Sequence, residues 1–354
     1  MKISVCIIAL NEERVIKRVL NCVKKFADEI IFVDTGSCDK TVRIAKEFTD
    51  KIYFFKWIDD FSKARNYAFS KATGDYLFWI DADDFISDDN IEKILKIKKS
   101  TDLKDTYMFK YSCGFDKDGK PSLTFYRERL LKNCSKAKFV GFVHEVVAPF
   151  GNIEYSDVEI EHRKEICSNS KRNLNLYKKH LPISNFTARE IYYFAKEYFY
   201  LGYYKTSVKL LKKFLNCTDK FAPDEKDALL TLSYCYKILG ENNYVDFLFT
   251  ALKTVGLDCE ILCKIGDYFL EKNDFLNAEK YFKCALSLSK NDCIGFCNTE
   301  YYHLYPLLQL IYLNFKVGNY SRSLYYHELC KLNYLTDKRV EFNENFFKQS
   351  QKNK

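Results

Sequence analysis

Short β-prone runs alternate with helical patterns over the first part of the chain. Four such runs predict strands that are buried on both faces of a sheet: Ile3–Leu10, Glu29–Val33, Ile52–Phe55 and Tyr76–Ile80. The segments between them carry apolar residues at helical spacing, and Asn11 is suited to cap the first of these helices. This alternation predicts an α/β fold with a right-handed, doubly wound, mostly parallel sheet.

Acidic loops follow three of these predicted strands. They contain Ala9–Glu12, Asp34 and Asp81–Asp83, and such loops meet at one edge of a parallel sheet. Carboxylates at that edge suit a hard divalent cation shared with nucleotide phosphates. No Gly-x-Gly-x-x-Gly follows the first strand, so a dinucleotide cofactor is not indicated. The alternative is that these acids only cap the next helix.

Further strands are expected beyond residue 100. Three runs predict a mixed, mainly antiparallel extension of the sheet, and a fourth leads into His162: Met108–Phe115, Leu123–Tyr126, Lys138–Val147 and Val158–Glu161. The charged triplet Arg127-Glu128-Arg129 lies between two of these runs.

From about Thr187 the pattern becomes continuously helical. Four turns recur in it, at Gly202, Gly240, Asn273 and Gly318. Their spacings are 38, 33 and 45 residues, against a period of ~34 for tetratricopeptide repeats. The third unit resembles such a repeat closely, and the others are degenerate. We expect an all-α helical-repeat domain, whose concave face would bind a partner. The alternative is a helical bundle that only stabilises the first domain or a homodimer.

Composition narrows the class of protein. The 354 residues suggest two domains. The net charge of +8 comes from interspersed acids and bases without a basic-aromatic array, so no nucleic-acid partner is expected. The 14 cysteines are scattered, many within apolar patterns, as in a reducing cytoplasm. Neither a signal peptide nor an apolar run of ~18 residues is present, so we expect a cytoplasmic protein without a membrane span.

Four motifs, in this order and spacing, resemble the inverting glycosyltransferases of family 2, which have the GT-A fold: Asn11-Glu12-Glu13, Val33–Asp39, Phe61-Ser62-x-Ala64-Arg65-Asn66 and Trp79–Asp83. The resemblance covers about residues 1–180 and implies a GT-A domain there, followed by a helical-repeat domain at 187–348. Three later motifs resemble the sublancin-type branch of bacteriocin S-glycosyltransferases, which carries helical-repeat tails: Phe139–Glu145, Glu161-His162 and Lys171–Leu174.

The resemblance also implies roles at the donor site. Asp34 would accept from the uracil ring of a UDP-sugar, beside the loop of Ala9, Leu10 and Glu12. Arg65 would approach the nucleotide or its diphosphate. In the Asp81-Ala82-Asp83 motif, Asp81 would bind the ribose or the water shell of the metal, and Asp83 would ligate Mg²⁺ or Mn²⁺. His162 is either a further ligand or phosphate contact, or a structural histidine at a strand end.

Inversion at the anomeric carbon requires a base for the acceptor's proton. Glu145 is the first candidate, and the rival interpretation gives the main role to His144 with Glu145 as its partner. Asp84 is the next candidate. A thiol acceptor would need the base less, because a cysteine of pKa ~8.5 is already partly ionised.

The resemblance, together with the helical-repeat domain, implies transfer of a hexose or N-acetylhexosamine from a UDP-sugar to a peptide or protein side chain, Cys or Ser/Thr. One alternative is a saccharide acceptor in lipopolysaccharide or capsule assembly. Another, of a different class, is a non-catalytic helical-repeat scaffold. The absence of a Gln-x-x-Arg-Trp motif disfavours a processive polysaccharide synthase.

Overall fold

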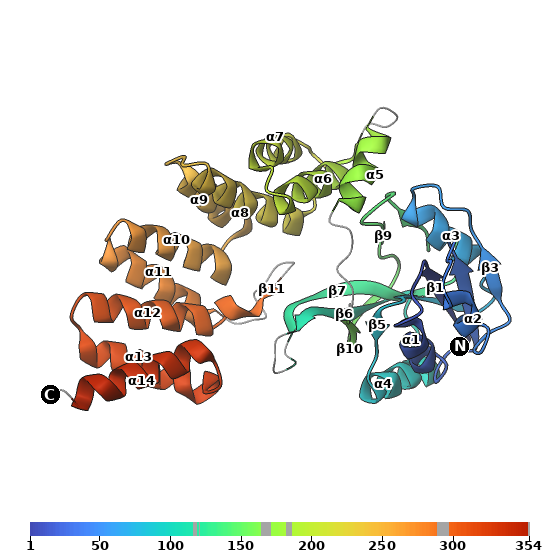
Figure 1. Ribbon diagram of the computed structural model, residues 1–354, viewed down its shortest axis with the longest axis horizontal. Coiled ribbons are helices and arrows are strands. Elements are labelled where there is room, and N and C mark those ends of the chain that lie inside the picture. Colours follow the sequence, from blue (N-terminus) through green and yellow to red (C-terminus); the bar gives the residue numbers. More distant parts are fainter. Residues whose placement is uncertain (116–118, 120, 164–170, 182–185, 289–296, 353–354) are drawn as a thin grey trace. The chain divides into compact units, whose positions relative to one another are not determined.

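The computed structural model describes residues 1–115, 119, 121–163, 171–181, 186–288 and 297–352 (Figure 1). The chain divides into two compact units, Met1–Phe186 and Thr187–Lys354.

The first unit is an α/β fold built on one mixed sheet. Its strands are β1 (Ile3–Ala9), β2 (Glu29–Asp34), β3 (Ile52–Phe54), β4 (Tyr76–Asp81), β5 (Asp84–Phe85), β6 (Thr106–Phe115), β7 (Pro121–Lys132), β8 (Phe139–Val140), β9 (Val146–Val147) and β10 (Ile153–His162). Its helices are α1 (Ile16–Val23), α2 (Thr41–Ala45), α3 (Phe61–Lys71), α4 (Asp88–Lys99) and α5 (Arg172–His180). The main sheet has the strand order β3-β2-β1-β4-β7-β6-β10-β5, and β8 pairs with β9.

The predicted parallel half of the sheet is confirmed. β3, β2, β1 and β4 are parallel neighbours, and β7 adds antiparallel to β4. Because side chains alternate along a strand, β1 contributes to the hydrophobic cores on both faces of the sheet. Val5 and Ile7 pack with α1 and α4 on one face, whereas Cys6 packs with α3 on the other. Both faces are covered by helices, which explains the uninterrupted apolar runs in the sequence.

Three local expectations were wrong. Asn11 does not cap α1, which begins five residues later; its φ of 56° is left-handed, and its Oδ1 accepts from Cys38 N–H at 2.8 Å. The segment Lys138–Val147 is two short strands joined by a tight turn with positive φ at Gly141 and His144. The Arg127-Glu128-Arg129 triplet lies inside β7, which is longer than expected.

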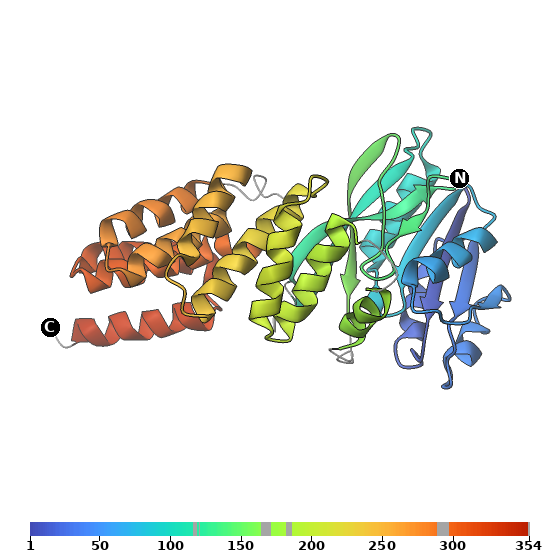
Figure 2. The same ribbon diagram turned by 90° about the horizontal axis from the view of Figure 1, so that it is seen from above.

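The second unit is all-α apart from one short strand. Its elements are α6 (Ala188–Tyr200), α7 (Tyr204–Leu215), α8 (Ala222–Ile238), α9 (Tyr244–Val255), α10 (Cys259–Glu271), α11 (Phe275–Ser287), β11 (Cys297–Asn298), the 3₁₀ turn Thr299–Tyr301, α12 (Leu304–Lys316), α13 (Tyr320–Tyr334) and α14 (Lys338–Lys352). Consecutive helices form hairpins that stack one after another (Figure 2).

The four predicted turns each join two helices of a hairpin. Gly202, Gly240, Asn273 and Gly318 all have left-handed φ, between 58° and 79°. At each turn the next N–H donates to the carbonyl five residues earlier, as Tyr203 does to Tyr198 at 2.9 Å and Asn319 to Asn314 at 2.8 Å. This pattern ends a helix by satisfying its last carbonyls. The repeat prediction is confirmed at these positions.

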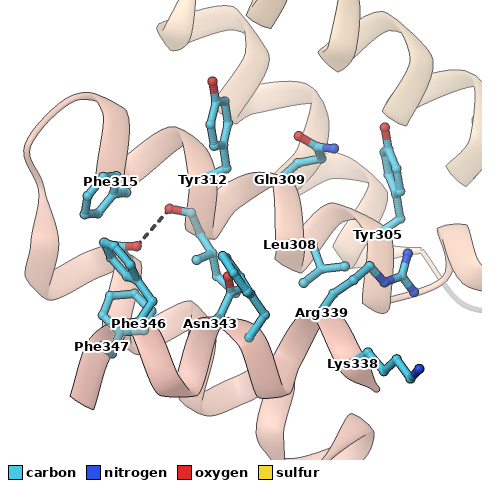
Figure 3. A pocket seen from close by; sticks show the side chains of 13 residues that line it. Tyr305, Leu308, Gln309, Tyr312, Phe315, Lys338, Arg339, Asn343, Phe346 and Phe347 are labelled. Carbon is cyan, nitrogen blue, oxygen red and sulfur yellow. Dashed lines mark hydrogen bonds between the residues drawn. The ribbon is translucent and has the colours of Figure 1, made fainter. Parts of the chain in front are cut away.

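A cavity of about 620 Å³ lies between α12 and α14 of the second unit (Figure 3). Six of its 13 lining residues are aromatic and come from both helices, among them Tyr312, Phe315, Phe342 and Phe346. No helix within the described ranges is long and apolar enough to cross a membrane.

Candidate active site

The loops after β1 and β2 form one edge of the site. Asp34 is buried, and its carboxylate accepts from the backbone N–H groups of Gly36 and Ser37 at 3.0 Å each. This tight turn needs the φ of +117° that Gly36 supplies. The Glu12 N–H donates to Thr41 Oγ1 at 2.7 Å, which ties the two loops together. β1 also pairs with β2 through Ala9 and Asp34 and with β4 through Ile8 and Asp81, so the three predicted loops lie at one sheet edge.

Not every residue of the predicted donor set turns its side chain toward this edge. Ala9 and Ala82 are buried in the apolar core on one face of the sheet, so only their backbone can contact a nucleotide. Leu10 is exposed. Glu12 is half-buried, and its burial and the charge of Asp83 raise its pKa.

Arg65 on α3 joins two carboxylates from distant parts of the chain. Its Nη2 donates to Asp81 Oδ1 and its Nε to Glu145 Oε1, each at 2.6 Å. The guanidinium is buried and stacks 4.7 Å from the Trp79 ring centroid. Burial by itself would raise the pKa of Asp81, but the charges of Arg65, Arg129 and His162 and the hydrogen bond from Arg65 together outweigh it and hold that pKa well below its usual range. Asp81 is thus a fixed anion.

Asp83 and His162 face each other across the ends of β4 and β10. His162 Nδ1 lies 3.4 Å from Asp83 Oδ1 and 3.4 Å from Asp84 Oδ1. Burial raises the pKa of Asp83, and so do the charges of Asp81 and Asp84, although His162 acts in the opposite direction. A hydrogen bond with Asp84 raises the pKa of His162. Burial and the neighbouring carboxylates therefore both disfavour the ionised form of Asp83.

This donor set fits a divalent cation. Asp83, Asp84 and His162 bring one potential ligand atom each within 4.8 Å of one another. Carboxylate and imidazole together suit Mn²⁺ as well as Mg²⁺ with bound water. Asp81 commits one oxygen to Arg65, so its second oxygen is the one that could face the cation or the ribose.

Asp84, the next candidate for the base, is fully buried. Its Oδ2 accepts from Asp81 N–H at 3.1 Å, and its Oδ1 accepts from the Tyr111 hydroxyl at 2.8 Å. Arg129 Nη1 lies 3.3 Å from Oδ2. Both oxygens are turned into the protein, which argues against a role as the base.

His144 and Glu145 lie in the turn between β8 and β9. His144 has a left-handed φ of 53°, and its ring lies 6.5 Å from that of Tyr177. Glu145 is mostly buried, and its backbone carbonyl accepts from Arg127 Nη2 at 3.3 Å. The Glu145 carboxylate contacts the Arg65–Asp81 cluster through Arg65.

Sequence reasoning missed several residues that build the site. Arg18 on α1 donates to the Asp83 carbonyl at 2.9 Å, and Tyr111 and Arg129 hold Asp84. The only signal in the sequence was the Arg127-Glu128-Arg129 triplet within an apolar region.

Comparisons with known proteins agree with this architecture. Residues 4–155 match the model of glycosyl transferase family 2. The chain is 32% identical over 259 residues to the SPbeta prophage-derived glycosyltransferase SunS of Bacillus subtilis, covering 68% of this chain and 59% of SunS. It thus spans well under two thirds of that relative.

An uncharacterised glycosyltransferase of Rickettsia felis is 30% identical over 230 residues, covering 57% of this chain and 81% of that protein. The crystal structure of S. aureus TarS is 15% identical, covers 93% of this chain and 92% of that chain, and gives a TM-score of 0.38. The first unit has the GT-A fold and the second consists of tetratricopeptide-like repeats. The chain belongs to glycosyltransferase family 2.

Proposed function

We propose that this glycosyltransferase moves a hexose or N-acetylhexosamine from a UDP-sugar to a peptide or protein side chain, Cys or Ser/Thr, with inversion and with Mg²⁺ or Mn²⁺. The carrying observation is the double ion pair of Arg65, which joins Asp81 at the end of β4 to Glu145 in the turn between β8 and β9. A donor-side residue and the candidate base thus belong to one rigid cluster.

On the donor side, Asp34 and the loop of Ala9, Leu10 and Glu12 would take the uridine. Asp81 would hold the ribose, while Asp83 and His162 would hold the cation. When bound, the cation would neutralise charge on the departing diphosphate. Arg65 keeps Asp81 ionised and occupies one of its oxygens, whereas the Asp83 carboxylate lies beside His162, the other proposed ligand.

On the acceptor side, Glu145 is the proposed base. Its Oε1 accepts from Arg65, and no described residue hydrogen-bonds Oε2, so that oxygen is available for the acceptor's proton. Removing that proton as the sugar bond forms is general base catalysis, which typically contributes ~10²–10⁴-fold in rate. Arg65 orients the carboxylate, and His144 next to it would contact the acceptor.

The second unit supports a peptide or protein acceptor. Aromatic side chains line its cavity between α12 and α14, and several are exposed: Phe342 is 71% exposed and Tyr312 49%. Figure 3 shows Phe315, on α12, beside Phe346 and Phe347, on α14. Among the described residues that line it there is no carboxylate, whereas Lys338 and Arg339 are present. An exposed aromatic surface of this kind is typical of a site for a protein or peptide.

The test is a panel of UDP-sugars with Mn²⁺, offered with peptides that contain Cys or Ser/Thr and, separately, with oligosaccharides. UDP release and acceptor mass are recorded together. We expect one UDP-sugar to support both, with a single-sugar mass increase on peptide. A mass increase on the saccharide alone would favour lipopolysaccharide or capsule assembly, and no turnover of any donor would favour a scaffold.

A further inference from the structure

Three guanidinium groups surround the indole ring of Trp79. Arg65, Arg127 and Arg129 lie 4.7, 4.8 and 3.7 Å from its centroid. Arg65 contacts the proposed base and Arg127 is partly exposed, whereas Arg129 is completely buried. The proposed reaction gives Arg129 no direct role, so the question is what this buried cation does.

A β-bulge aims Arg129 into the interior. In the pairing of β6 with β7, Tyr107 opposes Leu130 and Met108 opposes Glu128, which leaves Arg129 as an extra residue without a partner across the ladder. Bulges are frequent beside active sites because they redirect a side chain. Here the bulge brings Arg129 Nη1 to 3.3 Å from Asp84 Oδ2 and 3.2 Å from the Trp79 carbonyl.

Asp84, the partner of Arg129, contacts several residues of the proposed cation site. Asp84 is also completely buried, and its carboxylate binds the Asp81 N–H, the Tyr111 hydroxyl and the His162 ring. Asp81 precedes Asp83 by two residues, and the His162 ring lies 3.4 Å from the Asp83 carboxylate. A single buried carboxylate therefore holds both the backbone just before Asp83 and the imidazole beside it.

The surroundings of Arg129 indicate that the Arg129–Asp84 pair is structural and that Asp84 is not a ligand of the cation. Arg129 Nε and Nη2 are buried without a hydrogen-bond partner among the described residues. Burying unsatisfied donors lowers the stability of the fold. The contacts of the guanidinium with Asp84 and Trp79 must offset this loss. A buried arginine so close to Asp84 also competes with any second cation for that carboxylate.

We propose that Arg129 and Asp84 are positioning residues of the cation site, and that Asp84 is not itself a ligand. The pair holds Asp81 and His162 so that Asp83 and His162 meet a divalent cation in the correct geometry. This inference rests on the proposed function, because it presupposes that the chain binds Mg²⁺ or Mn²⁺.

The test compares Asp83→Asn, Asp84→Asn, Arg129→Met and the Asp84→Asn/Arg129→Met double variant in the full chain. The midpoint of thermal unfolding without metal measures how much the buried Arg129–Asp84 pair stabilises the fold. Calorimetric titration with Mn²⁺ measures the affinity of the cation site. Asp83→Asn should remove Mn²⁺ binding with an almost unchanged unfolding midpoint. Asp84→Asn and Arg129→Met should each lower the midpoint and weaken Mn²⁺ binding about 10–100-fold, as loss of outer-shell support does.

The double variant separates positioning from general stability. Neither charge of the pair is left buried alone in the double variant. Its unfolding midpoint should therefore lie well above those of the single variants and close to that of the wild type. Its Mn²⁺ affinity should stay weak, because Asp81 and His162 remain without their anchor. Should the single variants not fold, Tyr111→Phe removes only the hydroxyl that binds Asp84, and a several-fold weaker Mn²⁺ affinity is expected.

Two results would overturn the inference. Asp84→Asn with a normal midpoint and no Mn²⁺ binding would make Asp84 a ligand, and Arg129→Met with normal midpoint and affinity would leave the pair without a role. A wild-type chain that binds no Mn²⁺ even with UDP would instead overturn the cation site of the proposed function.

Discussion

Arg65 and Glu145 are 80 residues apart in the sequence, and their Nε and Oε1 atoms are 2.6 Å apart in the structure. This contact connects α3, which also carries the link to Asp81, to the turn that presents the proposed base. Both side chains are largely shielded from water. The proposed base is therefore linked to Asp81 through one arginine.

Glu145→Gln should retain the shape of the side chain and its contact with Arg65 while removing the base. We expect transfer to fall ~10²–10⁴-fold, the usual contribution of a general base, with UDP affinity nearly unchanged. Single-turnover transfer and UDP titration measure the two quantities. Glu92→Gln, an exposed change on α4, is the matched control. Wild-type transfer by Glu145→Gln would move the base to another residue, His144 first.

Arg65→Lys should keep the charge but lose the fork that binds two carboxylates at once. We expect at least a tenfold loss of transfer, because either Asp81 or Glu145 loses its orientation. Since removing one partner of a buried ion pair typically costs ~3–5 kcal/mol, the conservative lysine is preferred to alanine. Circular dichroism at the assay temperature establishes that the variant is folded. Unchanged kinetics would mean that the double ion pair does not organise the reaction.

Much of the fold could be predicted from the sequence. The parallel strands are continuous apolar runs because helices cover both of their faces, and the repeat turns carry Gly or Asn because the chain there needs a left-handed φ. The segment Lys138–Val147 was mispredicted because its β-prone composition hides a tight turn at Gly141 and His144. Local composition does not show which residues pair.

The residues that hold Asp84 in place could not be predicted from the sequence. Tyr111, Arg129 and His162 reach Asp84 from three strands that meet only in the folded sheet. The bulge at Arg129 depends on the register of β6 against β7, which no local pattern specifies. The motif residues at the strand ends could be found from the sequence because sheet topology alone brings them to one edge.

The cavity in the second unit makes a separate prediction. Phe342→Ser should weaken binding of the peptide acceptor several-fold, because the Phe342 side chain lines the cavity. Hydrolysis of the UDP-sugar should be unchanged, because Phe342 is not among the proposed donor-site residues. Phe221→Ser is the matched control, since Phe221 is similarly exposed, at 62%, but does not line the cavity. Fluorescence anisotropy of a labelled acceptor peptide measures the affinity. Equal effects of the two changes would remove the cavity from the acceptor site.

Asp224, at the start of α8, should make stability depend on pH. Burial raises its pKa to about 6, with Arg189 only partly compensating at 3.7 Å. Between about pH 4 and 6 the folded chain binds this proton more tightly than the unfolded chain does, so the contribution of Asp224 to stability falls as pH rises.

Asp224→Asn should therefore raise the stability of the second unit by roughly 1–3 kcal/mol at pH 7.5 and by less at pH 5, since one pKa unit corresponds to about 1.4 kcal/mol. Denaturant unfolding of both chains at the two pH values measures this. A variant that is less stable than wild type at pH 7.5 would show that the carboxylate is well satisfied by its surroundings.

The most direct measurement of the central claim is the mass of a Cys- or Ser/Thr-containing peptide after incubation with a UDP-sugar, Mn²⁺ and the full chain. The predicted result is a mass increase of one hexose or N-acetylhexosamine, which requires Mn²⁺ and disappears in Asp83→Asn and Glu145→Gln. UDP release with every peptide left unmodified, while an oligosaccharide gains the sugar, would contradict it.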